Sequence, residues 1–280
     1  MKKTPAGLRV LQYTILVLAA FFAFYPVWFA ILASGRVGDR LYTLNFAGMF
    51  FPTEWTFENY RVMLFEKPLL LWLRNSLYVA SATTVASLLI TTAAAFALSR
   101  FRFYGREFML IFLLAVQTFP GVLALVAVAQ ILTAMGLYRT HEGLILAYTI
   151  GTLVFSTWNM KGYFDTIPID LEEAAQIDGC GPLQSFVRIA LPLARPALAV
   201  TAMLGFLSGW GDYIFSSVLI PAPDSMKLAV AGLFSLANDQ SVPWGYFASG
   251  GMIIILPTIL VFLALQRFLV GGLTAGGVKG

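Results

Sequence analysis

The sequence predicts an all-α integral membrane protein. Of its 280 residues, 59% are hydrophobic and only 11% are charged, and the mean hydropathy is +0.81. A soluble domain carries about 25% charged residues, so this chain has too few charges to cover the surface of a compact soluble protein. Six apolar segments are of the length that crosses a hydrocarbon core of about 30 Å. We therefore expect six membrane-spanning helices.

The six segments define the expected organisation of a single transmembrane domain over residues 1–280. The expected spans are residues 10–33, 75–98, 108–135, 143–158, 197–220 and 249–270. The first span follows Lys2, Lys3 and Arg9 and is longer than the apolar part of a signal peptide, which has about 7 to 15 residues. We therefore expect it to be retained as a helix. The fourth span is the shortest of the six.

The distribution of basic residues predicts the orientation. Eleven Lys and Arg residues fall on the side that holds both termini, against seven on the other side. Because short cytoplasmic loops carry the excess of Lys and Arg, we expect both termini and the loop 159–195 in the cytoplasm. The segments 34–73 and 221–247 then lie outside. Segment 34–73 mixes apolar and polar residues and is expected to form a small extracytoplasmic lobe.

Several function classes are disfavoured by the composition. The single Cys180 excludes a disulfide framework, and the single His141 leaves no His/Cys cluster with metal-ligand spacing. The basic residues form no stripe of the kind that binds nucleic acid, and no glycine-rich Walker A pattern is present. A membrane enzyme would need a nucleophile beside a base, whereas Ser216 and Ser217 have no nearby histidine. We expect neither enzymatic activity nor a cofactor in this chain.

The loop 159–195 is punctuated like two short helices. Asp170 can cap the first helix, and Glu173 can reach back as its capping-box partner. Gly179 can end this helix in a left-handed conformation, and Pro182 suits the first turn of a second helix. Two short helices at an angle would form a rigid hook. Spacing alone leaves open whether the hook binds a partner or only connects two spans.

The residues of this hook carry a resemblance. Glu173-Ala174-Ala175, then Gly179, then nine residues, then Ile189-Ala190-Leu191-Pro192 resembles the EAA motif of permease subunits in bacterial ABC importers. The C-terminal residues 266–280 are similar to the glycine-rich tail of MalG-like permeases of maltose transporters. Patches at residues 71–76, 161–164 and 228–245 are similar as well. The resemblance extends from about Pro52 to the C-terminus and implies the six-helix type I importer architecture.

The resemblance implies roles for named residues. In that family the EAA hook is a coupling helix that docks on an ATPase subunit, and the expected docking residues are Glu173, Ala174, Ala175, Asp178, Gly179, Ile189, Leu191 and Pro192. The tail of the family reaches between two ATPase subunits, which implicates Gly276, Gly277, Val278, Lys279 and Gly280. A frayed chain end is the alternative for the tail.

The resemblance also implies partners and a substrate class. The expected partners are a homologous MalF-like permease, a MalK-like ATPase homodimer that binds ATP and Mg, and a MalE-like extracytoplasmic sugar-binding protein. The complex would lie in the bacterial inner membrane and import maltose or maltodextrin. Trehalose or another sugar is the alternative substrate.

Three further features are candidates for contact with the sugar or its binding protein. The external loop 221–247 is polar and aromatic in its second half, at Asn238, Asp239, Gln240, Ser241 and Trp244. The corresponding family loop reaches into the binding protein, although a plain connector is the alternative. Asp212 and Gln117 lie inside expected spans, where a polar group needs a partner or water. Gln117, followed by Pro120 and Gly121, marks a possible break in the third span and could be part of a gate or serve packing. Asp212 could line the pathway, pair with a partner subunit or serve local helix packing, and a proton-coupled carrier that uses Asp212 is the competing class of transporter.

Overall fold

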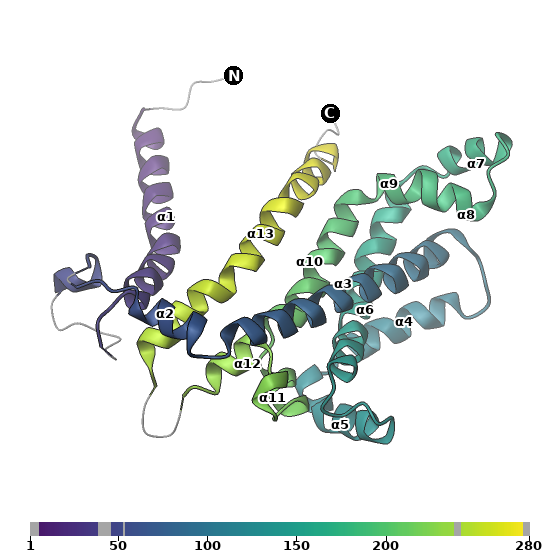
Figure 1. Ribbon diagram of the computed structural model, residues 1–280. Helices are drawn as coiled ribbons and strands as arrows, with labels where there is room; N and C mark the ends of the chain where they lie inside the picture. The colour runs from purple at the N-terminus through teal and green to yellow at the C-terminus, as the bar shows by residue number, and fades with distance from the viewer. Residues whose placement is uncertain (1–5, 39–45, 53, 238–241, 277–280) are drawn as a thin grey trace. The chain divides into compact units, whose positions relative to one another are not determined.

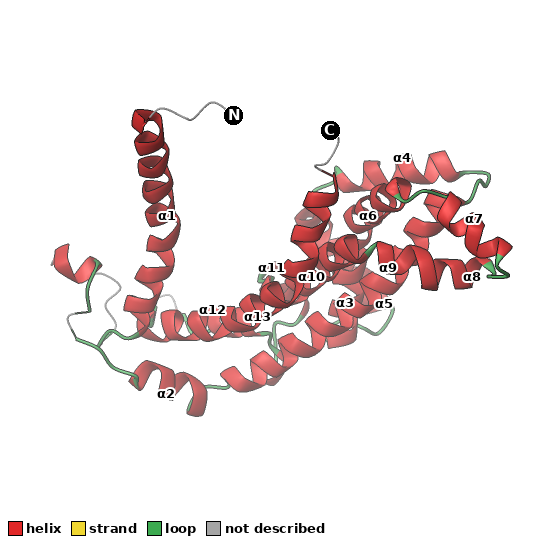
Figure 2. Cartoon of the chain, turned by 90° about the horizontal axis from the view of Figure 1, so that it is seen from above, coloured by secondary structure: helices red, strands yellow, loops and turns green. Residues whose placement is uncertain are grey.

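The computed structural model contains helices joined by loops, and no strand, over the residues that it describes, which are all except 1–5, 39–45, 53, 238–241 and 277–280 (Figure 2). This agrees with the predicted fold class. The chain divides into two compact units. The first unit comprises Met1–Leu69 and Leu233–Ile255, and the second comprises Leu70–Gly232 and Leu256–Gly280.

Four helices are long and apolar enough to cross a membrane: α1 (Ala6–Ser34), α3 (Leu69–Arg100), α6 (His141–Thr166) and α13 (Trp244–Gly276) (Figure 1). Two further candidates are bent pairs. The segment from α4 (Arg106–Gln117) to α5 (Leu125–Ala134) bends by 90°, and the segment that leads into α10 (Arg195–Gly211) bends by 81°. The described chain therefore reaches six candidate spans when each bent pair counts as one.

Two expected spans are interrupted in the structure. The expected helix over residues 108–135 breaks between α4 and the short 3₁₀ turn η2 (Gly121–Ala124), because Pro120 has an extended backbone and carries no N–H for helical hydrogen bonding. The expected helix over residues 197–220 ends at Gly211 and resumes as α11 (Ile214–Leu219). Conversely, α6 continues eight residues beyond the expected end at residue 158, to Thr166.

In the first unit, the segment after α1 folds back on the end of that helix. Asn59, in α2 (Glu58–Phe65), donates from Nδ2 to the carbonyl oxygens of Ser34 and Arg36 at 3.1 and 3.0 Å. Met63 of the same helix is buried. Near the beginning of α13, a side chain at Gly245 would meet Asn59 at less than 3 Å. The sequence thus brings α2 against both α1 and the first turns of α13. Between α1 and α2 lies the short 3₁₀ turn η1 (Phe46–Met49).

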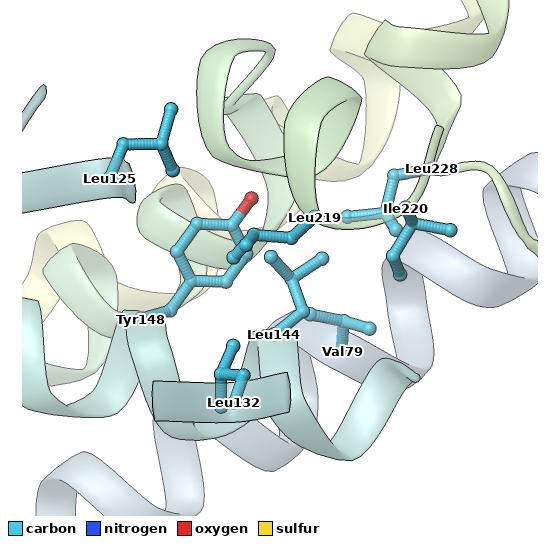
Figure 3. Packing of buried hydrophobic residues seen from close by; sticks show 8 residues of the cluster. All are labelled: Val79, Leu125, Leu132, Leu144, Tyr148, Leu219, Ile220 and Leu228. Atoms are coloured by element: carbon cyan, nitrogen blue, oxygen red, sulfur yellow. The ribbon is translucent and has the colours of Figure 1, made fainter. Parts of the chain in front are cut away.

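The second unit has an apolar core at one end of α3 and α6 (Figure 3). It combines side chains from α3, α5, α6 and α11 with Leu228, which precedes α12 (Ala229–Phe234). The buried members are Val79, Leu125, Leu132, Leu144, Tyr148, Leu219, Ile220 and Leu228. Because residues from so many helices converge here, this core fixes α5 and α11 against the two long helices.

Two glycines allow α10 to approach α3 closely. A Cβ on Gly209 would lie 2.6 Å from Cα of Ala80, and a Cβ on Gly205 would lie 3.0 Å from Cα of Thr84. Small residues of this kind let the backbones of membrane helices pack directly. Since α10 follows directly after the loop 159–195, this contact links that loop to the middle of α3.

Candidate functional site

The loop between α6 and α10 folds into a helical hairpin at one end of the second unit (Figure 1). Its first arm is α7 (Asp170–Ile177). Its second arm is continuous through α8 (Pro182–Ser185), a π-helical turn η3 (Phe186–Ala190) and α9 (Leu191–Leu193). Gly179 has φ = +89°, which confirms the expected left-handed turn. Pro182 lies in the first turn of α8, as expected.

The predicted cap of the first arm is wrong. Ile169 is the N-cap residue of α7, and its side chain cannot accept a hydrogen bond. Helical hydrogen bonding already begins here, because the carbonyl of Ile169 accepts from the N–H groups of Glu172 and Glu173 at 2.9 and 3.0 Å. Asp170 is therefore inside the helix. Together with Glu172 and Glu173 it places negative charge in the first turn, where the helix dipole favours it.

A buried ion pair attaches the hairpin to the end of α3. Arg100 Nε lies 2.7 Å from Glu172 Oε1, and the two side chains are only 9% and 6% exposed. Arg100 also donates from Nη2 to the carbonyl of Ile167 at 3.0 Å. The sequence alone did not indicate a pairing of Arg100 with Glu172. The available signal was a carboxylate one residue before Glu173 that would need a partner if buried.

The same arginine begins a chain of polar contacts that reaches α6. Arg100 Nη1 donates to Ser99 Oγ at 3.0 Å, and Ser99 Oγ donates to Asp165 Oδ1 at 2.6 Å. Asp165 Oδ2 in turn accepts from Lys161 Nζ at 2.6 Å. The network joins the end of α3, the end of α6 and the start of α7. The buried contact of Arg100 with Glu172 is the part of this network that fixes the first arm.

The second arm is held by aromatic packing. The ring centroid of Phe186 lies 4.6 Å from that of Phe96 on α3 and 6.4 Å from that of Phe164 on α6. Phe96 and Phe164 meet edge to face at 5.6 Å. The surrounding buried residues include Ala95, Met160, Ile167, Ala190, Ala194 and Ala197. Because packed interiors are dense, these aromatic contacts allow the hairpin little movement relative to α3 and α6.

The outer face of the hairpin carries charge and large apolar side chains. Glu173, Ala174, Asp178 and Gly179 are all exposed, as are the apolar side chains of Ile177 at 87% and Leu183 at 73%. In contrast, Ala175 is only 8% exposed because it faces inward. Of the two alanines expected to contact a partner, only Ala174 offers its side chain.

The other predicted residues of the second arm are partly covered. Ile189, Leu191 and Pro192 are half-buried, so they pack against the rest of the hairpin as well as reaching its surface. A small cavity of about 150 Å³ lies between the two arms and α3, lined by residues that include Arg100, Glu172, Glu173 and Ser185. Ser185 is buried and its hydroxyl has no partner among the described residues.

The two candidates inside the expected spans lie at helix breaks. Gln117 is the last residue of α4 and is exposed, directly before the break at Pro120. Asp212 lies between α10 and α11 and is half-buried. Its carboxylate accepts from the N–H of Phe215, with Oδ2 at 2.9 Å and Oδ1 at 3.1 Å. Although Tyr213 is the N-cap residue of α11, the Asp212 carboxylate satisfies an N–H of the first turn and so has a local capping function.

The structure describes only some of the remaining predicted residues. Trp244 begins α13, is exposed and packs edge to face against Phe247. Asn238, Asp239, Gln240 and Ser241 lie outside the described residues, as do Gly277, Val278, Lys279 and Gly280. Gly276 is the last residue of α13. Within the described chain, no group of three or more His, Cys, Asp or Glu residues could hold a metal ion.

A second set of contacts fixes the segment before α12 and was not predicted as a unit. Trp72 Nε1 donates to the carbonyl of Asp224, within the 3₁₀ turn η4 (Asp224–Met226), at 2.8 Å. Asn75 Nδ2 donates to the carbonyls of Ser225 and Lys227 at 2.8 and 3.0 Å. Ser76 Oγ accepts from the N–H of Ala229 at 2.8 Å. The first turns of α3 thereby hold residues 224–229 in place.

Comparison with known proteins identifies relatives along the chain. Residues 87–274 match the profile of the family described as "Binding-protein-dependent transport system inner membrane component". The galactooligosaccharides transport system permease protein GanQ of Bacillus subtilis is 38% identical over 273 residues, which cover 96% of this chain and 95% of that protein. The maltodextrin transport system permease protein MdxG of the same organism is 36% identical over 97% and 96% of the two chains.

A relative from another genus and a solved structure agree. The maltose/maltodextrin transport system permease protein MalG of Salmonella typhimurium is 39% identical over 91% of this chain and 90% of that protein. A chain in the crystal structure of a bacterial ABC transporter involved in the import of the acidic polysaccharide alginate superposes with a TM-score of 0.80. It is 22% identical, and the match covers 95% of this chain and 99% of that one. This likeness shows a shared fold.

Proposed function

Because this chain belongs to the family of inner membrane components of binding-protein-dependent transport systems, we propose that it forms one half of the translocation pathway of an ABC importer for maltodextrins or related oligosaccharides. The proposed substrate class is supported by relatives that are named for galactooligosaccharides, maltodextrin and maltose. Trehalose or another sugar remains the alternative substrate. The chain itself is a transport component and not the ATP-hydrolysing subunit.

The proposed complex has four kinds of subunit. A homologous, MalF-like permease completes the pathway, and a MalK-like ATPase homodimer binds ATP and Mg, so this chain needs no cofactor of its own. A MalE-like binding protein delivers the sugar from outside. Both termini and the hairpin then lie in the cytoplasm, in agreement with the excess of Lys and Arg expected there.

The observation that carries the proposal is that two neighbouring glutamates differ in burial and therefore in what they can contact. Glu172 is buried against Arg100 at 2.7 Å, whereas Glu173 is exposed on the outer face. The first glutamate attaches the hairpin to α3, and the second is free to meet a basic residue of the ATPase. Ile177 and Leu183 add apolar surface for a protein partner on the same hairpin.

Coupling is then mechanical. When the ATPase subunits close, they move the hairpin, and the ion pair of Arg100 with the Phe96–Phe186 contact transmits that movement to α3. Gly205 and Gly209 bring α10 against α3, so the two helices tilt together. The mechanism requires that the ATPase bind the inward-open and outward-open states with different affinity.

We assign the sugar-facing functions to the helix breaks and to the external loop. Gln117, at the break after α4, is a candidate for the pathway, because non-helical backbone at membrane depth occurs where it is buried in protein or lines a wet cavity. The loop that contains Asn238, Asp239, Gln240, Ser241 and Trp244 would meet the binding protein. Asp212 supports this pathway indirectly, since it caps α11.

The test is ATP hydrolysis and sugar uptake by the complex reconstituted in vesicles with sugar-loaded binding protein. Glu173→Arg is expected to reduce stimulated hydrolysis and uptake about tenfold or more, because a like charge would face the basic residue of the ATPase. Glu107→Arg is the matched control, since Glu107 is exposed in the first turn of α4, outside the hairpin. Uptake that continues without any ATPase would contradict the proposal. A panel of maltotriose, trehalose and a galactooligosaccharide identifies the sugar.

A further inference from the structure

An apolar groove runs between three membrane helices of the second unit. Its volume is about 270 Å³, and its lining includes Leu88 of α3, Leu198 and Ala202 of α10, and Leu265 and Phe268 of α13. Pockets for whole ligands usually have about 300 to 1,000 Å³, so this groove suits one narrow apolar chain. It is open to the surface of this unit.

One end of the groove carries a positive charge. Arg195, the first residue of α10, contributes to the lining, is exposed and has no ion-pair or hydrogen-bond partner among the described residues. At the same end Arg267 stacks over the ring of Phe268, with Cζ 4.8 Å from the ring centroid. Both arginines are exposed. The groove is thus apolar along its walls and cationic at its mouth.

The length of the groove along α10 fits the upper part of a lipid acyl chain. From Arg195 to Ala202 the α10 helix rises about 10 Å, which is the depth of the first part of an acyl chain below its head group. An arginine at the end of a membrane helix reaches the head-group layer, and basic pockets between membrane helices favour anionic head groups. The neighbouring side chains Leu89 on α3 and Leu263 on α13 are exposed and apolar, so the groove continues a surface suited to hydrocarbon.

We propose that this groove is a binding site for an anionic phospholipid, with one acyl chain along Leu198, Ala202 and Leu265 and the phosphate at Arg195. Because the lipid contacts α3, α10 and α13 at once, it holds these three helices together near the hairpin. This site is independent of the sugar that is carried. The proposed occupant is a lipid molecule and not a segment of the second permease, because the exposed Arg195 at the end of the apolar groove favours an anionic head group.

The test uses the whole complex in vesicles of phosphatidylcholine that contain either phosphatidylglycerol or phosphatidylcholine with a photoreactive acyl chain. Labelled peptides are located by mass spectrometry. The ratio of phosphatidylglycerol to phosphatidylcholine labelling at residues 198–202 and 265–268 is expected to exceed the ratio at the other labelled helices. Arg195→Gln should reduce this excess about fivefold, because one interfacial cation contributes about that factor for an anionic lipid. Arg195→Lys should retain most of it.

Two further variants separate the site from general lipid contact. Arg74→Gln removes an exposed cation near the opposite end of α3 and should leave groove labelling unchanged. Ala202→Phe fills the groove and should reduce labelling with both lipids, and Leu265→Trp serves the same purpose if Ala202→Phe does not assemble. Equal lipid ratios at all labelled helices, or an Arg195→Gln variant that behaves like wild type, would overturn the proposal. Absence of groove labelling in the wild-type complex would also overturn the proposal and would indicate that protein covers the groove.

Discussion

Arg100, the last residue of α3, forms a buried ion pair with Glu172, in the first turn of α7, with Nε and Oε1 2.7 Å apart. The pair joins a membrane helix directly to the hairpin that we propose as the ATPase dock. The adjacent Glu173 is exposed. The hairpin therefore has one carboxylate for attachment and a second for a partner, at consecutive positions of the chain.

Removal of one member of this pair is expected to destabilise the hairpin. Arg100→Met leaves the Glu172 carboxylate buried without a countercharge, which costs about 3–5 kcal/mol. The double variant Arg100→Met/Glu172→Leu removes both charges and should lose much less. Hydrogen exchange of the α7 amides in the purified complex measures the difference. An equal loss in the single and double variants would show that the charge of Glu172 is not the cause.

Lys161→Met is the matched control for that experiment. Lys161 also donates to a carboxylate, Asp165 Oδ2 at 2.6 Å, and although the Lys161 side chain is only 12% exposed, that of Asp165 is 42% exposed. Exposed pairs contribute about 1 kcal/mol or less. The exchange rates of α7 should therefore change little in Lys161→Met.

The two glycines in the turn of the hairpin, Gly179 and Gly181, differ in backbone conformation. Gly179 has φ = +89°, and a methyl group there meets no atom within 4 Å, so Gly179→Ala should cost about 1–2 kcal/mol through backbone strain alone. Gly181 has φ = −71° and equally open surroundings. Gly181→Ala should therefore have a much smaller effect. Protease sensitivity of the loop and stimulated ATP hydrolysis compare the two variants, and equal effects would exclude backbone strain as the reason for Gly179.

The contact of α10 with α3 predicts a steric effect in the membrane part. Gly209→Ala places a methyl group 2.6 Å from Cα of Ala80, and overpacking of this kind costs about 1–3 kcal/mol. Gly211→Ala, two residues further, meets nothing within 4 Å and is the control. The midpoint of thermal aggregation of the purified complex is expected to fall only for Gly209→Ala. A fall of similar size for Gly211→Ala would point to glycine flexibility instead of close packing.

Asp212 separates the importer from a proton-coupled carrier. As a cap of α11 its carboxylate accepts from the N–H of Phe215, and asparagine caps as well as aspartate. We therefore expect Asp212→Asn to retain ATP-dependent uptake, while Asp212→Ala loses about 1 kcal/mol of stability. Loss of uptake in Asp212→Asn with normal assembly would indicate that the ionisable proton matters, as a carrier requires.

The hairpin could be predicted because its turn residues have few alternatives. Gly179 and Pro182 mark the turn and the second helix through backbone conformations that other residues adopt at a cost, and both expectations are confirmed. The cap at Asp170 could not be predicted reliably. Its side chain competes with a helical start one residue earlier, which depends on the backbone of Ile169.

The tertiary contacts could not be predicted from the sequence. Arg100 and Glu172 are separated by 72 positions along the chain, and nothing local couples them. The same is true of Trp72 and Asp224, although residues 71–76 and 228–245 each resemble the family as separate patches. The structure explains the second case, since the first turns of α3 donate to the segment that leads into 228–230.

The interruptions of the expected spans were also not predictable from local hydropathy. Hydropathy averages over a window, so residues 197–220 read as one helix although Asp212 ends α10 and caps α11. Pro120 explains why α4 ends near Gln117, since it carries no N–H for helical hydrogen bonding, but Pro120 alone does not set the 90° angle between the two helices. Local composition therefore predicts the number of apolar segments better than their continuity.

The central claim is that the outer face of the hairpin contacts the ATPase. The most direct measurement is cysteine cross-linking in the assembled complex, in a Cys180→Ser background that removes the single native thiol. Ile177→Cys, at a position that is 87% exposed, should cross-link to cysteines introduced into the ATPase, whereas Ala175→Cys, at an 8% exposed position of the same helix, should not. The yield at Ile177→Cys should also change when ATP is added. Equal yields at the two positions, or no cross-link from Ile177→Cys in a complex that still transports sugar, would contradict the account.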